Sequence, residues 1–348
     1  MKQRANPYSL DKTMDRRAFL RISGLLGVGI FSAGLFPVTA EAVKFNRRMY
    51  KVSETRLAMG TFVSMTLIHP SRDEAQDAMG LAFEEIDRLS GVLSRFDRST
   101  ALSLLNREGY LKDAPPELFH VIKRSLGYYR LTHGAFDVTV KPIVDLFQES
   151  VGAKGKLMPP RKRLREAAEL VGSDKVVLAG KGIEFKKHGM GITLDGVAKG
   201  YIVDRASDLL AKKGIRNHLV NAGGDIMTRG TKAGDRPWTI AIEDPSKKGN
   251  YPDVIHLRHG GVATSGNYEI YFDKEKMFHH IVDPRTGLSP ELSTSVSVRA
   301  GSAVEADALA TGVFVMGPEE GTALVNSLLR CESLVIARNG TLWKSKGW

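Results

Sequence analysis

Two adjacent histidines in the stretch FHHIVDPRTG are, by residue type, the best candidates for moving a proton. The pKa of a histidine lies near neutrality, so His280 can act as a general base, and Asp283 can orient it or hold the turn. In a strand, His279 would point to the opposite face. The alternative is a surface turn that happens to contain histidine, because DPRTG has proline at its second position and glycine at its end.

A second pair of residues has the spacing of ligands for a hard cation. Asp307 and Thr311 are four residues apart in EADALATG, so on a helix they share one face. A carboxylate and a hydroxyl are oxygen ligands that suit Mg²⁺, and two protein oxygens leave room for waters and ligand phosphates. The alternative is that Asp307 caps a helix and Thr311 bonds to its own backbone.

The stretch GITLDGVAKGYIVDR predicts a strand that turns into a helix, which is an arrangement that can bind anions. The strand ends at Asp195, the chain turns through Gly196, and the helix start offers free backbone N–H groups. Lys199, one turn further, would add a positive charge beside phosphates. An ordinary turn with a solvated lysine is the alternative. The stretch SRFDRSTALSLLN joins a helix end to an Asp- and Ser-rich turn, and HGAFDVTVKPIVDLF is a glycine-led extended segment; taken alone, both say little about function.

The elements that must position these residues follow an irregular order of strands and helices. Apolar residues at helical spacing predict helices over 73–96, 115–134, 164–172, 196–214, 304–317 and 322–330. Short apolar or alternating runs predict strands over 56–70, 175–195 (three strands), 218–230, 237–245, 253–266 and 269–273, and a hairpin over 333–345. This order predicts an α+β fold with mixed sheets and packed helices, not a regular βαβ repeat.

The composition narrows the function classes. The net charge of the 348-residue chain is +11, but its basic residues are scattered and do not interleave with aromatic ones. This argues against nucleic-acid binding and agrees with an anionic ligand such as a dinucleotide. With Cys331 as its only cysteine, the chain can form no internal disulfide and no cysteine-based metal site. The patterns GxGxxG and GxxxxGK[ST] are absent, so a Rossmann or P-loop site is not supported.

The N-terminal segment has the features of an export signal. Arg16 and Arg17 precede an apolar, glycine-rich run over 24–36, and the small residues AEA follow at 40–42. This resembles a twin-arginine signal, although Asp15 stands where Ser or Thr is commoner. We expect a signal peptide over residues 1–42, export to the periplasm, and no membrane span after cleavage. An uncleaved anchor is the alternative, but the run is short for a membrane span.

Nine ordered stretches of the chain resemble the ApbE family, the FAD:protein FMN transferases, from about Met59 to Gly317. They are AMGTFVSMTL, LSRFDRSTALSLLN, GAFDVTVKPIVDLF, GVAKGYIVDR, NAGGDI, PWTIAIEDP, GVATSGNYE, HHIVDPRTG and EADALATG. The twin-arginine signal and ITLDGVAKGYIVDR are most similar to the NosX-like branch, which is associated with nitrous oxide respiration. The resemblance implies one ApbE-like, T-fold-related domain over residues 43–348.

The resemblance also implies a reaction and a site. FAD is the substrate: it is cleaved at its diphosphate, AMP leaves, and FMN is joined by a phosphoester bond to a Thr or Ser of a partner protein. His280 corresponds to the base, and Asp307, Thr311 and the backbone carbonyl of Gly196 correspond to the Mg²⁺ ligands. The flavin-contacting positions correspond to Met59, Phe96, Ala135, Phe136, Asp137, Thr193, Lys199 and Ile281.

One position departs from the family pattern, and the partner is known only by type. Many members have Asp where Thr193 stands, so either Thr193 makes that cofactor contact or Asp195 takes over part of it. The implied acceptor is a flavoprotein with a periplasmic FMN-binding domain, with a NosR-like regulator as first candidate. Two other functions stay open: a non-catalytic FAD-binding maturation factor for a nitrous oxide respiratory complex, and an FAD pyrophosphatase that releases FMN and AMP.

Overall fold

The computed structural model describes residues 14–15, 41–44, 48–152, 159–245, 250–267 and 281–348. The predicted signal peptide lies almost wholly outside the described residues, as do the predicted strand 269–273 and both histidines of the HHIVDPRTG stretch. No helix of the described part is long and apolar enough to cross a membrane.

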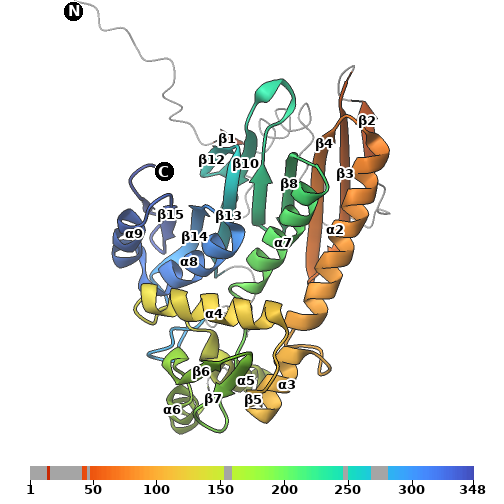
Figure 1. Ribbon diagram of the computed structural model, residues 1–348. Coiled ribbons are helices and arrows are strands. Elements are labelled where there is room, and N and C mark those ends of the chain that lie inside the picture. Colours follow the sequence, from red (N-terminus) through yellow and green to blue (C-terminus); the bar gives the residue numbers. More distant parts are fainter. Residues whose placement is uncertain (1–13, 16–40, 45–47, 153–158, 246–249, 268–280) are drawn as a thin grey trace, which may run out of the picture.

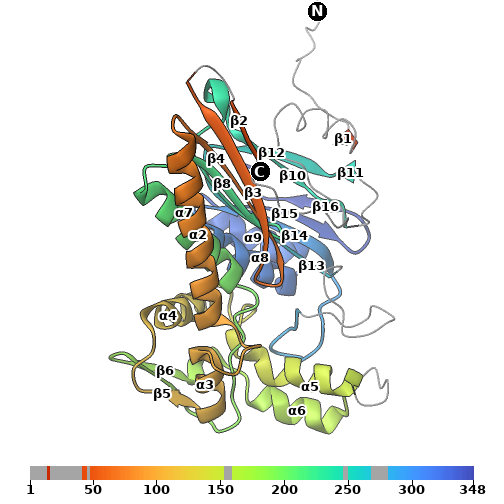
Figure 2. The ribbon, with the colours of Figure 1, turned by 90° about the vertical axis from the view of Figure 1, so that its right-hand side faces the viewer.

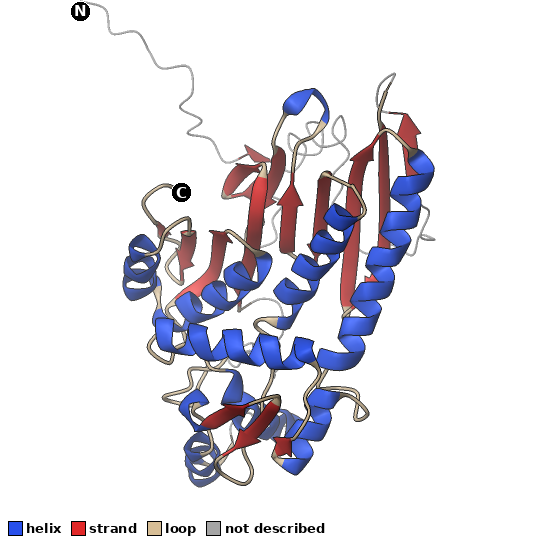
Figure 3. Ribbon diagram, in the orientation of Figure 1, coloured by secondary structure: helices blue, strands red, loops and turns tan. Residues whose placement is uncertain are grey.

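An antiparallel sheet of nine strands forms the larger part of the described fold (Figures 1 and 3). Its strands, from one edge to the other, are β16 (Leu342–Lys344), β15 (Glu332–Ala337), β14 (Ser293–Ala300), β13 (His259–Gly266), β9 (Asp225–Arg229), β8 (Asn217–Ala222), β4 (Thr61–His69), β3 (Tyr50–Ala58) and β2 (Glu41–Lys44). The predicted α+β class with mixed sheets and packed helices is confirmed.

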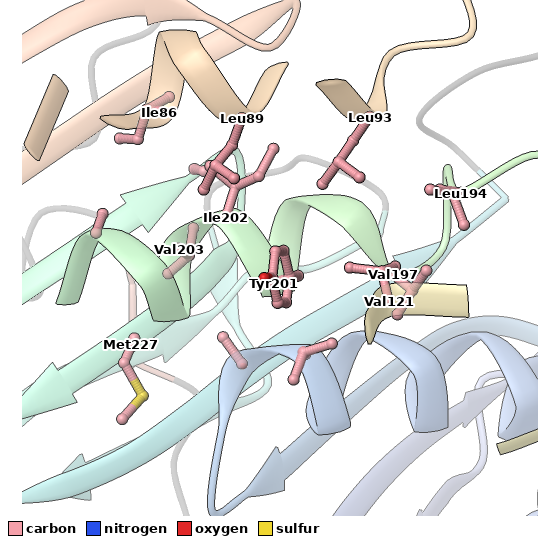
Figure 4. Close-up of a cluster of buried hydrophobic side chains, with 14 of the residues drawn as sticks. Ile86, Leu89, Leu93, Val121, Leu194, Val197, Tyr201, Ile202, Val203 and Met227 are labelled. Atoms are coloured by element: carbon pink, nitrogen blue, oxygen red, sulfur yellow. The ribbon is translucent and has the colours of Figure 1, made fainter. Parts of the chain in front are cut away.

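Three helices cover one face of this sheet: α2 (Arg72–Leu93), α7 (Ala198–Lys212) and α8 (Ala303–Met316) (Figure 1). The α2 sequence buries residues at helical spacing, and the Ser71 hydroxyl accepts the N–H of Glu74 at its start. The α8 sequence is apolar on nearly every side, because α8 packs against the sheet, α7 and α9 (Pro318–Ser327). The side chains between α2, α7 and the sheet form the main core (Figure 4).

A smaller module lies below the sheet layer (Figure 2). It holds α3 (Ala101–Glu108), α5 (Lys141–Gly152), α6 (Arg161–Glu169) and the sheet β5 (Tyr110–Leu111), β7 (Gly182–Phe185) and β6 (Val176–Ala179). Helix α4 (Pro116–Leu131) runs between this module and the sheet layer. Short 3-10 turns cover Val138–Val140, Ser173–Lys175 and Ala233–Asp235.

The opposite face of the large sheet carries the hairpin strands β10 (Trp238–Ile242) and β12 (Asp253–Leu257). The Trp238 side chain is 1% exposed and packs there with Ile68, Leu219 and Val262. A further two-residue pairing joins β1 (Met14–Asp15) to β11 (Asn250–Tyr251).

Three sequence expectations about the small module are wrong. Helices α3 and α5 were not predicted, and the residues of α5 were expected to be extended. The third strand expected at the end of 175–195 is absent, because residues 190–195 form no ladder. The side chain of Asn106 holds this segment instead, accepting the N–H of Ile192 at 2.7 Å and donating to its carbonyl at 2.9 Å.

Candidate functional site

A pocket at the junction of the sheet layer and the small module collects most of the predicted site residues; we call it the site pocket. Its lining consists of Ala135, Phe136, Asp137, Val138, Val140, Val144, Thr193, Asp195, Gly196, Lys199, Thr264, Ser265, Gly266, Ile281, Val282, Asp307 and Thr311. Nine of the twelve residues predicted from the sequence belong to this set: six of the eight cofactor positions and all three metal positions. The fold therefore brings together residues that lie up to 176 positions apart (135 to 311).

The three predicted metal ligands lie next to each other. Asp307 and Thr311 project from α8, and a Cβ atom added to Gly196 would lie 2.8 Å from Thr311 Oγ1, so the Gly196 backbone lies directly against that hydroxyl. The Ser265 hydroxyl is 3.2 Å from Thr311 Oγ1. Among the described residues, no three His, Cys, Asp or Glu side chains converge on one point. A carboxylate, a hydroxyl and a backbone carbonyl fit a hard cation that keeps several other oxygen ligands, as Mg²⁺ does.

The carboxyl group of Asp307 is held in an environment that disfavours its charge. Burial raises the pKa of Asp307 well above its usual value, and the nearby negative charge of Asp225 raises it further, while Lys199 acts in the opposite direction. One oxygen, Oδ2, accepts the Gly200 N–H at 3.1 Å. A cation at this carboxylate would favour its ionised form, so the site is electrostatically prepared for a positive ligand.

Lys199 is the second residue of α7, where it forms an ion pair with Asp225. Its ammonium nitrogen is 2.8 Å from Asp225 Oδ2, and the Asp225 side chain is only 2% exposed. Asp225 begins β9 after the tight Gly223–Gly224 turn, and the Asn221 side chain closes that turn by accepting the Gly224 N–H at 2.9 Å. We expected Lys199 to lie near phosphates, whereas no role was predicted for Asp225.

The start of α7 offers fewer free donors than the sequence predicted. The N–H groups of Val197 and Ala198 both donate to the Leu194 carbonyl, at 3.0 and 2.8 Å, and that of Gly200 donates to Asp307. The expectation that these backbone groups are free to bind an anion is therefore wrong for all three. The positive charge that this helix start brings to the pocket is that of Lys199.

Asp137 has its carboxylate fully engaged inside the protein. Its Oδ1 accepts the N–H and hydroxyl of Thr139 and the hydroxyl of Ser173, and its Oδ2 accepts the Ser173 N–H, all at 2.6–3.1 Å. Burial raises the pKa of this carboxyl, and the four hydrogen bonds oppose that rise. Asp137 thus fixes the wall formed by Ala135 and Phe136, and its carboxylate is not aimed at the pocket as a free group.

Two predicted cofactor residues, Met59 and Phe96, do not line the site pocket. Met59 stands at the tip of the β3–β4 hairpin with a φ of 53°, packed at the edge of the main core. The Phe96 side chain is 74% exposed, and the Arg95 guanidinium lies 4.4 Å from its ring centre. Arg95 also forms an ion pair at 2.9 Å with Asp195, which does line the pocket. Phe96 is therefore tied to the pocket rim through one arginine.

His280 lies outside the described residues, and the structure describes the chain again from Ile281 onward. The side chains of Ile281 and Val282 are buried and line the pocket. The Asp283 N–H donates to the Leu288 carbonyl and the Asp283 carbonyl accepts the Gly287 N–H, both at 2.8 Å, so DPRTG is a turn as the sequence predicted. This turn fixes the chain direction on the C-terminal side of the histidine.

Thr193 occupies the position at which the sequence departs from the family pattern. Its N–H donates to the Val138 carbonyl at 2.8 Å, and its hydroxyl accepts the Asp195 N–H at 3.3 Å. The Asp195 carboxylate is bound by Arg95. Both residues line the pocket, so the structure keeps both as candidates for the cofactor contact.

Sequence reasoning missed Asp225, Ser265, Asn106 and Arg95. Asp225 and Ser265 stand in the stretches NAGGDI and GVATSGNYE, which had drawn attention as motifs without a role for either residue. Asn106 and Arg95 act on the pocket through partners 86 and 100 residues away in the chain, and no local pattern signals such contacts.

The sequence and the fold of the chain are both similar to those of known proteins. A model of the ApbE family matches residues 59–335. The FAD:protein FMN transferase of Vibrio cholerae is 32% identical over 252 residues, covering 70% of this chain and 75% of the relative. That of Haemophilus influenzae is 30% identical over 278 residues, covering 75% and 80%. The crystal structure of the ApbE protein of Thermotoga maritima gives a TM-score of 0.77 at 30% identity, over 85% of this chain and 97% of that one. The flavin transferase ApbE of V. cholerae gives 0.74 at 26% identity, over 89% and 98%.

Proposed function

The chain belongs to the ApbE family and is an FAD:protein FMN transferase, and we propose that the transfer takes place in the site pocket. The observation that carries this proposal is the convergence of five separate stretches of chain on one pocket: 135–144, 193–199, 264–266, 281–282 and 307–311. They combine an apolar wall with a carboxylate, hydroxyls and an ammonium group. Such a lining suits a ligand that joins a flat apolar ring to an anionic diphosphate.

The reaction is a phosphoryl transfer to a hydroxyl group, with FAD as substrate. The hydroxyl oxygen of a Thr or Ser of the acceptor forms a bond to the FMN phosphorus, and the bond between that phosphorus and the oxygen bridging to AMP breaks. The acceptor loses its hydroxyl proton, and AMP leaves. Because this hydroxyl does not ionise near pH 7, a base must take the proton as the bond forms, a contribution of about 10²–10⁴-fold.

We assign the role of base to His280. The support comes from its neighbour, since Ile281 lines the pocket and the Asp283–Leu288 turn anchors that side of the segment. A histidine has the appropriate pKa range for accepting a proton at neutral pH.

We assign Mg²⁺ binding to Asp307, Thr311 and the backbone carbonyl of Gly196. When bound there, the ion would stabilise the negative charge of the diphosphate and of departing AMP. The protein's own contribution is to bury the Asp307 carboxyl against α7, keep the Thr311 hydroxyl within 3.2 Å of Ser265, and pack Gly196 against it. Lys199, paired with Asp225, adds a positive charge on the same side of the pocket.

The flavin end of FAD is assigned to the wall formed by Ala135, Phe136 and Ile281, all of which are buried and apolar. Phe96 exposes a large apolar ring and is tied to the pocket rim through Arg95 and Asp195, while the contact predicted for Met59 stays a prediction. An exposed aromatic side chain tied to the rim suits contact with a ring that projects from the pocket.

The decisive experiment follows both products of the reaction. The protein is incubated with FAD, MgCl₂ and a periplasmic FMN-binding domain, and the acceptor mass and free AMP are measured. Transfer gives an FMN-sized mass gain and an equal amount of AMP. AMP without a mass gain indicates a pyrophosphatase, and neither product indicates a non-catalytic FAD-binding maturation factor.

The site of action that we propose is the periplasm, reached by twin-arginine export. The support is the sequence of the N-terminal segment, in which Arg16 and Arg17 precede a short apolar run. Replacing both arginines by lysine should block export, so that the protein accumulates in the cytoplasm. Periplasmic accumulation at the wild-type level would contradict this route.

The acceptor that we propose is a membrane flavoprotein with a periplasmic FMN-binding domain, of the NosR-like type, as expected for a protein of the NosX-like branch. The support is limited to the twin-arginine segment and the ITLDGVAKGYIVDR stretch. Purification of a NosR-like protein from cells with and without this chain tests it directly. Covalent FMN in both preparations would show that this chain is not needed to attach FMN to a NosR-like protein, and its acceptor would then be a different protein.

A further inference from the structure

Two buried carboxylates and one ammonium group stand together where the metal and the diphosphate are expected. Asp225 and Asp307 are 2% and 5% exposed, and the negative charge of Asp225 raises the pKa of Asp307. Lys199 is the cation of this group: it is paired with Asp225 at 2.8 Å, and its charge also acts on Asp307. Burying a second carboxylate beside a metal-binding one is costly, since like charges in a low-dielectric site repel. Because this burial is costly, we looked for a role that Asp225 has in the site.

Without the Asp225 carboxylate, the Lys199 ammonium would lose the ion pair that now determines its position. An ammonium group on a long flexible stem moves to the nearest buried negative charge. Asp307 is the other buried carboxylate whose charge Lys199 already senses, and Lys199 and Asp307 both line the site pocket. An ammonium seated on Asp307 would occupy the oxygen that a divalent cation needs.

Resting on the proposed Mg²⁺ site, we propose that Asp225 is a positioning residue that holds the Lys199 ammonium away from Asp307, so that Asp307 stays open to the metal while Lys199 stays available to the diphosphate. Asp225 touches neither the metal nor the substrate in this role.

The structure supports this role through the way Asp225 is fixed. The Asn221 side chain closes the turn before it, and the Gly223 N–H donates to the Phe62 carbonyl at 3.2 Å, which ties the turn to the β3–β4 hairpin. A Cβ atom on Gly223, whose φ is +60°, would lie 2.5 Å from Thr61 Oγ1, so the turn and the hairpin tip are in tight contact. Because these contacts fix the backbone at the start of β9 and the Asp225 side chain is short, its carboxylate can hold the longer and more flexible Lys199 side chain.

The test uses isosteric variants of the full chain and Mn²⁺ as the probe, with binding measured by electron paramagnetic resonance and therefore without catalysis. In Asp225→Asn the ammonium is released, and we expect Mn²⁺ binding to weaken about tenfold. Lys199→Met should bind Mn²⁺ at least as well as the wild type. The double variant Lys199→Met/Asp225→Asn should regain affinity to within about threefold of the wild type, because the competing cation is gone.

The outcomes separate this role from others. Unchanged Mn²⁺ affinity in Asp225→Asn overturns the proposal, and so does equal weakening in Asp225→Asn and the double variant, which would show that Asp225 acts by its own charge or by supporting the fold. Should Asp225→Asn fail to fold, Lys199→Met and the double variant still decide, since the proposal requires them to bind Mn²⁺ equally within about threefold. A wild-type protein that binds no Mn²⁺ would instead remove the proposed metal site itself.

Discussion

Replacing Gly200 by alanine adds one methyl group where α7 crosses α8. The new Cβ would lie 2.5 Å from the Ala303 carbonyl oxygen, 2.7 Å from its carbon and 2.8 Å from Val304 Cα. All three are backbone atoms of the first turn of α8, so no side-chain rotation relieves the contact. That turn is also fixed from α7, because the Asp204 carboxylate accepts the N–H groups of Ala303 and Val304 at 2.8 and 3.0 Å. The helices must separate by about 1 Å, from 2.5 Å to an ordinary contact of at least 3.4 Å.

The expected magnitude follows from two opposing effects. Alanine in place of glycine in a helix stabilises a protein by roughly 0.5–1 kcal/mol. Overpacking a filled interior costs about 1–3 kcal/mol, and a clash with backbone belongs at the upper end of that range. We expect Gly200→Ala to lower the free energy of unfolding by about 2 kcal/mol. Gly80→Ala is the matched control, because Gly80 lies inside α2 with nothing within 4 Å of its added Cβ, and it should gain about 0.5–1 kcal/mol.

Urea unfolding measures both variants, and Mn²⁺ binding provides a second readout. Because the Gly200 N–H donates to Asp307 Oδ2 at 3.1 Å, separating the helices also displaces that carboxylate. Gly200→Ala should therefore bind Mn²⁺ more weakly, while Gly80→Ala should bind it as the wild type does. If Gly200→Ala is as stable as Gly80→Ala and keeps wild-type Mn²⁺ affinity, the close crossing of α7 and α8 does not position Asp307.

The sequence was sufficient for those parts of the site that depend on one element at a time. The i, i+4 spacing of Asp307 and Thr311 placed them on one face of a helix, and both line the pocket from α8. The DPRTG turn was readable from proline and glycine alone. The long amphipathic pattern of α2 was similarly clear, since its buried residues recur at the helical period.

The parts that the sequence could not provide depend on distant partners. Residues 190–195 have the composition of a strand, but their backbone groups bond to Asn106 and Val138, so no ladder forms. The start of α7 looked like a set of free donors until Leu194 and Asp307 were found to accept them. For residues 190–195 and for Gly200 the competing hydrogen-bond partner lies on another element, about which a local sequence pattern gives no information, whereas Leu194 lies just before the helix.

Helix α5 was missed for a different reason. The stretch HGAFDVTVKPIVDLF was interpreted as a glycine-led extended segment, but Pro142, at the second residue of α5, is well tolerated in the first turn of a helix. The apolar residues Ile143, Val144, Leu146 and Phe147 then pack into one cluster with Leu164 of α6 and with Val282. Since Val144 and Val282 also line the pocket, this helix forms part of the site's wall.

Three further substitutions test the chemistry and the electrostatics of the site. His280→Ala should retain FAD binding, measured by flavin fluorescence, but lose about 10²–10⁴-fold in transfer rate; a near-wild-type rate would reject His280 as the base. Asp307→Ala should lose activity together with its Mg²⁺ dependence, and an active variant that resists EDTA would rule out this metal site. Burial raises the pKa of Asp204 from 3.8 to about 6, so the folded protein keeps this proton up to about pH 6 while the unfolded chain releases it near pH 4. Wild-type stability should therefore fall by about 3 kcal/mol, relative to Asp204→Asn, as pH rises from about 4 to 6, with the full loss present above pH 6. Parallel pH profiles of unfolding for the two proteins would show that the Asp204 carboxyl group does not carry this shifted pKa.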